Sequence, residues 1–152
     1  MMPEIYFLRY ARPCADFMLQ RGEINCSELS KIDCMLYEKI SVDREFIERI
    51  FYRAILPLKK ISKNYWNINT IKQYFHVVHN ELIDSCSEGF EHLTGFQKEL
   101  CRVHEGIVKS VNKDYYEVSC GNETEKVLKG WVNDAKPDDI VFIHYAMAVE
   151  KK

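Results

Sequence analysis

The sequence has neither an excess of one charge nor a long apolar run. Its 21 Lys and Arg residues face 23 Asp and Glu residues, which leaves a net charge of −2. Binding to nucleic acid or to an anionic membrane surface through charge requires a basic excess, so we expect neither partner. No apolar run approaches the roughly 18 to 20 residues that a membrane-spanning helix needs. The composition, 47% hydrophobic and 29% charged, is that of a globular protein.

An export signal is also missing from the first residues. Glu4, Arg9 and Arg12 interrupt the apolar residues there, whereas a signal peptide has an unbroken apolar centre. We therefore expect a cytoplasmic protein with reduced thiols. No two cysteines form a C-x-x-C pair, so most are expected to pack as small buried side chains. The six are Cys14, Cys26, Cys34, Cys86, Cys101 and Cys120.

Common enzyme motifs are absent as well. The sequence contains no G-x-G-x-x-G, no P-loop, no H-E-x-x-H and no G-x-S-x-G, which argues against a nucleotide enzyme or a hydrolase. His76 and His79 lie three residues apart, on one helix face. No Glu follows His76, so we expect both to border the core or to face a partner rather than to hold a metal. The protein is predicted not to be an enzyme.

Residues 1–97 have the apolar periodicity of helices, with apolar side chains three and four positions apart. We expect four helices, whose apolar stripes cover residues 4–20, 29–40, 46–58 and 68–82. Pro13 and Pro57 are expected to bend or break their helices, and Gly22 to end the first. The expected N-caps are Ser27, Ser41 or Asp43, and Asn67 or Asn69. Four short helices predict a small bundle of unknown role.

Residues 98–152 change to the period of strands. Tyr116, Val118 and Cys120 alternate with polar residues, as on a half-buried strand. The segment 136–139 is a predicted turn, and the apolar run 140–149 is a predicted strand buried on both faces. Several strands within about fifty residues indicate a small antiparallel β-barrel. The predicted fold class is α+β, with a helical domain at 1–97 and a barrel at 98–152.

The last third resembles the HypC/HupF family of hydrogenase maturation factors. The resemblance is carried by Cys101, Gly106, the turn Lys136-Pro137-Asp138-Asp139, His144 and the ending Ala148-Val149-Glu150-Lys151. It departs from the family in three places. Residues 1–100 precede the cysteine, which is the first residue of the mature family proteins. Glu105 stands where the family has proline, and Asp138 stands where its turn has glycine.

This resemblance implies a barrel of the oligonucleotide-binding type that acts as a metallochaperone. Family members dock onto the iron–sulfur protein HypD and transiently bind iron that carries cyanide and carbon monoxide ligands. They deliver that Fe(CN)2CO group to the precursor of the [NiFe]-hydrogenase large subunit. It implies that Cys101 supplies the thiol, that His144 supports it, and that Cys101, Gly106 and His144 contact the partner.

The residue chemistry is compatible with that role but leaves alternatives open. A thiolate is a soft ligand for iron, and a nearby imidazole can accept the thiol proton. His104, in Cys101-x-x-His104, is a third candidate ligand beside Cys101 and His144. Alternatively, Cys101 packs and His104 faces solvent. The rival function is a protein-interaction adapter that binds no metal, and a Cys–His catalytic centre is a third option. The carrier hypothesis requires an accessible Cys101 sulfur.

Overall fold

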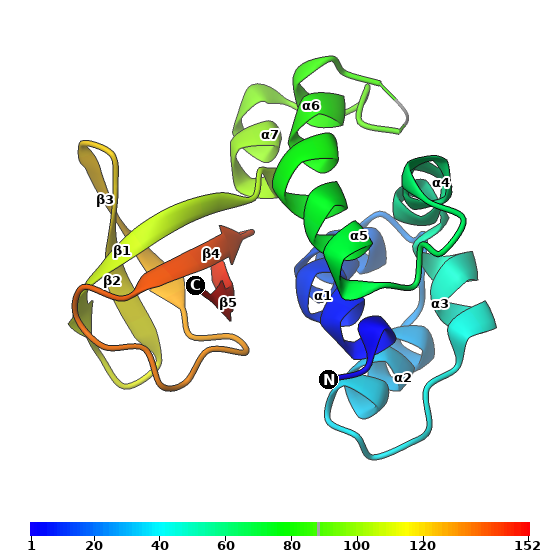
Figure 1. Cartoon of the computed structure of the whole chain (residues 1–152), viewed down its shortest axis with the longest axis horizontal. Coiled ribbons are helices and arrows are strands. Elements are labelled where there is room, and N and C mark those ends of the chain that lie inside the picture. Colours follow the sequence, from blue (N-terminus) through cyan, green and yellow to red (C-terminus); the bar gives the residue numbers. More distant parts are fainter. Residues whose placement is uncertain (88) are drawn as a thin grey trace. The chain divides into compact units, whose positions relative to one another are not determined.

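The chain folds into a helical unit, Met1–Leu93, and a barrel unit, Thr94–Lys152 (Figure 1). The computed structural model describes residues 1–87 and 89–152. The predicted mixture of an N-terminal helical part and a C-terminal barrel is confirmed at this level.

The helical unit follows the four predicted apolar stripes, but two of them are subdivided. Its third stripe forms two helices, and its fourth forms two helices around a π-helical turn. Among the described residues, no helix combines the length and the apolar character that crossing a membrane demands. The elements are α1 (Pro3–Gln20), α2 (Cys26–Leu36), α3 (Arg44–Ile50), α4 (Tyr52–Ile61), α5 (Ile68–Gln73), η1 (Tyr74–Val78) and α6 (His79–Asp84).

Two of the predicted helix caps are confirmed and one is wrong. Asp43 caps α3 and Asn67 caps α5, each through a side-chain oxygen that accepts a backbone N–H. At α2 the cap is Asn25 rather than Ser27. The Asn25 side chain accepts the Glu28 N–H, and the Glu28 carboxylate accepts the Asn25 N–H, both at 3.0 Å. This reciprocal capping box satisfies two backbone donors at once, which Ser27 would not do.

Neither helix is broken at its internal proline. α1 continues through Pro13 and α4 continues through Pro57. Both prolines are buried, so packing offsets the hydrogen bond that each ring removes. The interruption in the third stripe lies instead at Phe51, between α3 and α4. Gly22 follows the end of α1 with φ of +71°, a left-handed conformation that suits glycine.

Phe7 lies at the centre of the helical unit's aromatic core. Its side chain has no exposed surface. Its ring centroid lies 5.7 Å from that of Phe51, 5.5 Å from that of Trp66 and 5.6 Å from that of Phe75. One side chain of α1 therefore packs against the α3–α4 junction, the residue before the α5 cap, and η1.

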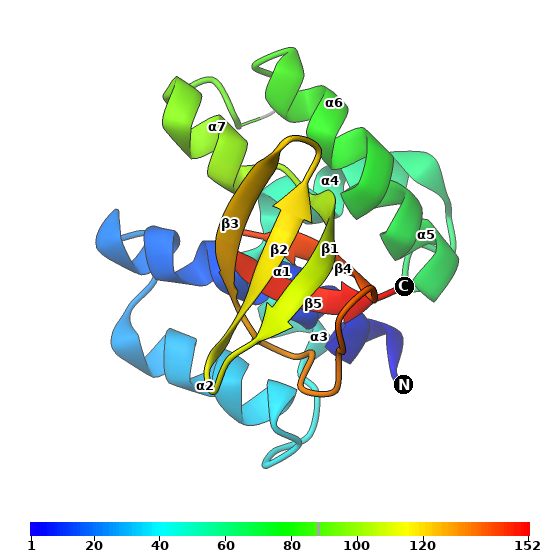
Figure 2. The same ribbon diagram turned by 90° about the vertical axis from the view of Figure 1, so that its left-hand side faces the viewer.

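The barrel unit begins with α7 (Gly95–Cys101) and continues as five strands (Figure 2). The strands close in the order β1-β2-β3-β5-β4, and β1 pairs with β4. All pairs are antiparallel except β3 with β5. The strands are β1 (His104–Val111), β2 (Tyr115–Cys120), β3 (Glu123–Leu128), β4 (Ile140–His144) and β5 (Met147–Lys151).

The prediction of one long strand at 140–149 is wrong, because this run folds back as the β4–β5 hairpin. Tyr145 and Ala146 form its two-residue turn, with φ of 49° and 55°. Two successive positive φ angles define a type I′ turn, which matches the twist of the flanking strands. Asn-Gly is the usual sequence of such turns, so Tyr-Ala gave no turn signal.

Alternation along the strands builds the barrel core, as predicted for β2. Val118 and Tyr116 point inward with no exposed surface. β1 carries a bulge between Val108 and Ser110, where its register against β2 shifts. The extra residue bends the strand, and such bends are common at barrel rims. The buried core consists of Val108, Tyr116, Val118, Val127, Val132, Ala135, Val141, Ile143 and Ala148.

The predicted turn at 136–139 is present and contains a strained residue. The Asp139 N–H donates to the Lys136 carbonyl at 3.1 Å, and Asp138 has φ of 73°. Proline at the second position and a positive φ at the third define a type II turn, whose third position favours glycine. Aspartate tolerates this conformation less well than glycine does.

We therefore expect Asp138→Gly to stabilise the barrel unit by about 1 kcal/mol. Amide hydrogen exchange of β2 peptides in the full chain measures this change. Asp114→Gly is the matched control: Asp114 is exposed and is not among the residues with positive φ, so this change should slightly destabilise the unit. Equal effects of the two substitutions would contradict the assignment of strain to Asp138.

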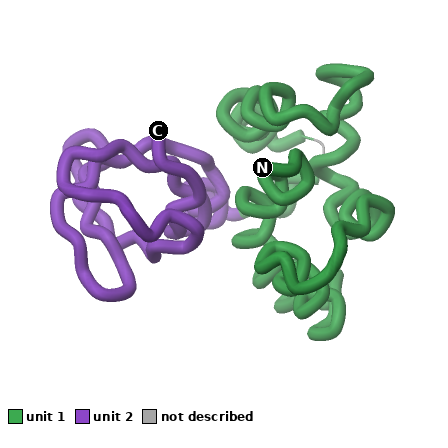
Figure 3. The backbone as a smooth tube through the Cα atoms, turned by 60° about the horizontal axis from the view of Figure 1, so that its bottom comes forward, with its two compact units in different colours: residues 1–93 green, residues 94–152 purple. Residues whose placement is uncertain are grey.

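The boundary between the two units lies between Leu93 and Thr94 (Figure 3). The sequence pattern predicts this boundary after residue 97. The segment between the two positions belongs to α7. Thr94 caps this helix in a second capping box: it accepts the Gln97 N–H at 3.3 Å, and Gln97 accepts the Thr94 N–H at 2.9 Å. The barrel unit thus begins at the capped N-terminus of α7.

Candidate functional site

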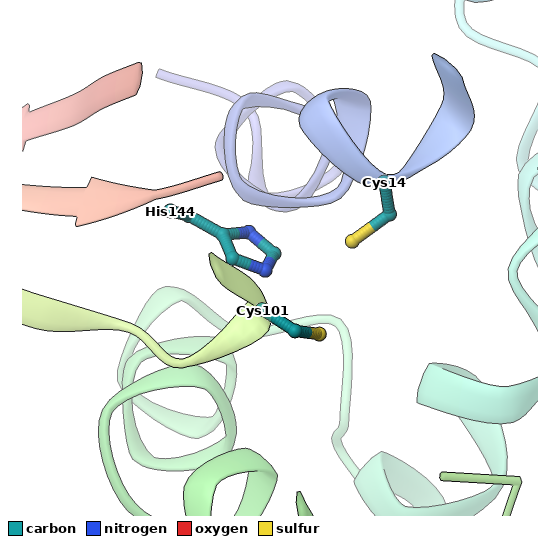
Figure 4. A group of neighbouring side chains, drawn as sticks. All are labelled: Cys14, Cys101 and His144. Carbon is teal, nitrogen blue, oxygen red and sulfur yellow. The ribbon is translucent and has the colours of Figure 1, made fainter. Parts of the chain in front are cut away.

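Cys101 and His144 lie close together in the barrel unit. Cys101 is the last residue of α7 and His144 is the last residue of β4. The Cys101 Sγ atom lies within 4.8 Å of a ring nitrogen of His144 (Figure 4). Figure 4 also draws Cys14, which belongs to α1 of the helical unit. The structure therefore brings together the two residues that the family resemblance singles out.

Local backbone contacts hold this pair in place. The Tyr145 N–H donates to the Leu100 carbonyl at 2.8 Å, which joins the last turn of α7 to the β4–β5 turn. Since Leu100 precedes Cys101 and Tyr145 follows His144, this one hydrogen bond fixes the two side chains beside each other. The Tyr145 ring also packs against the His144 imidazole, with centroids 5.0 Å apart.

Both side chains of the pair are buried. Cys101 is 3% exposed and His144 has no exposed surface. The accessible sulfur that the carrier hypothesis requires is therefore not present in this conformation. One thiol and one imidazole are too few for a closed structural metal site, which takes four protein ligands. A thiol sulfur and an imidazole nitrogen are both metal-ligand atoms, so the pair could bind a metal ion whose remaining ligands come from outside the pair.

His104 does not belong with Cys101 and His144. It is the first residue of β1, and its ligand atoms group with those of Cys120 and Glu125, all within 4.8 Å of one another. Among the described residues, no group joins all three of the ligands predicted from the sequence. The predicted ligand set thus divides between two places in the barrel unit.

The second group has explicit hydrogen bonds. The Cys120 thiol donates to Glu125 Oε1 at 2.8 Å, and His104 Nε2 lies 2.8 Å from the same oxygen. Nδ1 of His104 lies 3.1 Å from the Arg102 carbonyl oxygen. Because both acceptors lack protons, the two contacts are hydrogen bonds together only when the imidazole carries two protons.

The environment shifts two pKa values in this group. Burial raises the pKa of the Cys120 thiol to about 12, together with the hydrogen bond to Glu125 and the charges of Glu125 and Glu123. Burial also raises the pKa of Glu125, but hydrogen bonds from Cys120 and His104 outweigh it, so the net pKa is lowered. A protonated thiol therefore faces an ionised carboxylate.

Sequence reasoning missed this group because its members are far apart in the chain. Cys120 was assigned to the core on its alternation, and Glu125 was not singled out. The signal was present in the turn at 121–122, which pairs Val118 with Glu125 and Cys120 with Glu123. This register makes Cys120 and Glu125 diagonal neighbours on one face of the β2–β3 pair.

Gly106, a predicted partner contact, is buried in the barrel. A Cβ atom at this position would lie 2.7 Å from Ile143 Cδ1, 3.1 Å from Cys120 Sγ and 3.2 Å from Val118 Cβ. Glycine is thus required here by close packing, which does not involve a partner.

The two helical-unit histidines border the core, as predicted. Nε2 of His76 lies 2.7 Å from the Tyr10 hydroxyl. His79 is 3% exposed, and its ring packs against Tyr74, Phe75 and Phe90. These contacts give both residues a packing role.

Comparison with known proteins gives no family assignment: no family model matches the chain, and a search of curated proteins finds no significant match. Functional inference therefore depends on the residues and their geometry.

Proposed function

We propose that this chain is a HypC-like hydrogenase maturation chaperone rather than an enzyme. In this role it docks in the cytoplasm onto a HypD-like iron–sulfur protein and onto a [NiFe]-hydrogenase large-subunit precursor. Its cargo is iron carrying cyanide and carbon monoxide. The observation that carries the proposal is the proximity of Cys101 Sγ to the His144 ring, within 4.8 Å, in one barrel.

The strand arrangement supports an oligonucleotide-binding-like barrel, the fold that the resemblance implies. Strands β1, β2 and β3 form a meander, and the β4–β5 hairpin returns so that β4 pairs with β1. A five-stranded barrel with this kind of return connection is typical of that fold.

The proposed chemistry uses the Cys101–His144 pair directly. The thiolate of Cys101 would bind the iron, since thiolates are soft ligands. His144 would accept the thiol proton, because only the deprotonated sulfur is a metal ligand. Since Cys101 is buried, docking has to expose it before the cargo binds.

Infrared spectroscopy of the co-purified complex tests the proposal. The full chain is co-expressed with a HypD-like protein and purified, and the cyanide and carbonyl stretching bands are recorded. We expect the bands with the native sequence, their loss with Cys101→Ala, and their retention with Cys26→Ala, which changes an exposed cysteine. Bands that persist in Cys101→Ala would overturn the assignment of the iron ligand.

A second candidate function is a protein-interaction adapter that binds no metal. The 3% exposure of Cys101 favours it, because a buried thiol serves packing. The same purification distinguishes the two functions. Co-purification of the HypD-like partner without infrared bands, unchanged in Cys101→Ala, would support the adapter and contradict the carrier.

A further inference from the structure

Three side chains of the types that bind metals, His104, Cys120 and Glu125, lie close together at one end of the barrel interior. On each of β1, β2 and β3 the inward-facing row passes from a buried valine to a more exposed residue near the strand end. Those rows run from Val108 through Gly106 to His104 on β1, from Val118 to Cys120 on β2, and from Val127 to Glu125 on β3. His104, Cys120 and Glu125 therefore lie two residues or more along their strands from the buried valines, at the edge of the apolar core.

The donor atoms already converge. Glu125 Oε1 lies 2.8 Å from both Cys120 Sγ and His104 Nε2. A tetrahedral zinc ion has ligands at about 2.0 to 2.3 Å, which places neighbouring ligand atoms about 3.5 Å apart. The carboxylate oxygen thus needs to move less than 1 Å away from each of the other two donor atoms to reach this spacing, and all three atoms already lie within 4.8 Å of one another.

The outer contact of the histidine is the one that metal-binding imidazoles use. Nδ1 of His104 faces the Arg102 carbonyl oxygen at 3.1 Å. A metal-ligating histidine donates its second ring N–H to a carbonyl or carboxylate, which fixes the ring orientation and the tautomer. With its proton on Nδ1, His104 presents the Nε2 lone pair to Cys120 and Glu125.

We propose that His104, Cys120 and Glu125 bind a zinc ion at this end of the barrel. One nitrogen, one sulfur and one oxygen donor are the ligand types that zinc takes in proteins, and three protein ligands leave a fourth position open. Thiolate and carboxylate together balance the charge of the divalent ion. Cu(I) is less suited, because the carboxylate is a hard ligand and no second thiolate is part of the group. Non-haem Fe(II) is less suited because its usual site has two histidines beside the carboxylate, and this group has one.

The surroundings give the ion access from solvent. The side chains of His104 and Glu125 are 33% and 37% exposed, so an ion enters from solvent. On binding, the Cys120 thiol proton passes to solvent, together with the Nε2 proton when the imidazole carries two, and the sulfur and nitrogen lone pairs bind the metal.

This site is separate from the Cys101–His144 pair and does not depend on the carrier function. Reduced, metal-free full-length protein is titrated with Zn²⁺ against a chromophoric zinc indicator. Co²⁺ serves as the optical probe, since a cobalt–thiolate bond absorbs in the near ultraviolet. We expect one tightly bound ion per chain and a cobalt–thiolate band.

Substitutions identify the ligands. Cys120→Ser should remove the cobalt–thiolate band and weaken zinc binding by roughly 100-fold or more, since even outer-shell changes cost 10-fold to 100-fold. Glu125→Gln and His104→Gln should each weaken it by at least roughly 10-fold. Cys101→Ser and Cys26→Ser are the matched cysteine controls and should change neither the band nor the affinity.

Two outcomes would overturn the site. The first is a native chain that binds no zinc at stoichiometric concentration. The second is a band and affinity that survive Cys120→Ser or that disappear with Cys101→Ser instead. Amide exchange of the β2 strand verifies folding of each variant, and Glu125→Gln, which preserves side-chain shape, decides the question if Cys120→Ser does not fold.

Discussion

Replacing Phe7 with alanine is expected to destabilise the helical unit by about 4 kcal/mol. The Phe7 ring is fully buried and contacts the rings of Phe51, Trp66 and Phe75. Its removal takes away apolar burial and leaves a cavity that aromatic neighbours from three separate segments cannot all close. Loss of the edge contacts between rings adds to this cost.

Amide hydrogen exchange of α1 peptides measures the effect of this substitution. Phe7→Leu fills most of the volume and should cost about 1.5 kcal/mol or less, which keeps the series interpretable if Phe7→Ala unfolds the unit. Tyr52→Ala is the matched control, because Tyr52 is an aromatic residue of the same unit and is 50% exposed. A loss of stability in Tyr52→Ala equal to that in Phe7→Ala would contradict the aromatic core described above.

Gly106→Ala is expected to destabilise the barrel unit by about 2 kcal/mol, the usual cost of overpacking a core. The added methyl group would lie 2.7 Å from Ile143 Cδ1, closer than real carbon contacts allow. Ile143 is fully buried and belongs to the barrel core, so it cannot move aside without disturbing its neighbours. Amide exchange of β1 and β2 peptides measures the change.

A double substitution tests the cause of this loss. Ile143→Val removes the Cδ1 atom and alone should cost about 1 kcal/mol. Combined with Gly106→Ala, it should cost less than the sum of the two single changes, because the contact no longer exists. Gly95→Ala is the control, since a Cβ there meets nothing within 4 Å. Strict additivity of the pair would disprove the steric explanation.

Local periodicity was enough to predict the helical and barrel parts but not their interruptions. The stripes of apolar residues locate the helices correctly, because burial of one face is a local pattern. No proline or glycine marks the break at Phe51, whose buried ring packs against Phe7. The β4–β5 turn was missed for a similar reason: Tyr145 and Ala146 adopt φ values that their residue types disfavour.

The candidate sites divide in the same way. Cys101 and His144 were found through the order of motifs in the last third, and the structure places them together. The partnership of His104 with Cys120 and Glu125 depends on the register of three strands. That register is set by the turn at 121–122 and by the pairing of β1 with β2, neither of which a single-residue pattern encodes.

The closed strand order limits how another protein can recognise the barrel unit. Because the bulged β1 bends to pair with both β2 and β4, each of the five described strands has a neighbour on either side. Strand addition is disfavoured along β1, β2 and β4, whose edges are paired over several residues. β3 and β5 pair only at Leu128 and Met147, so an incoming strand has room to pair there. Elsewhere on the barrel a docking partner has to contact side chains and connecting loops.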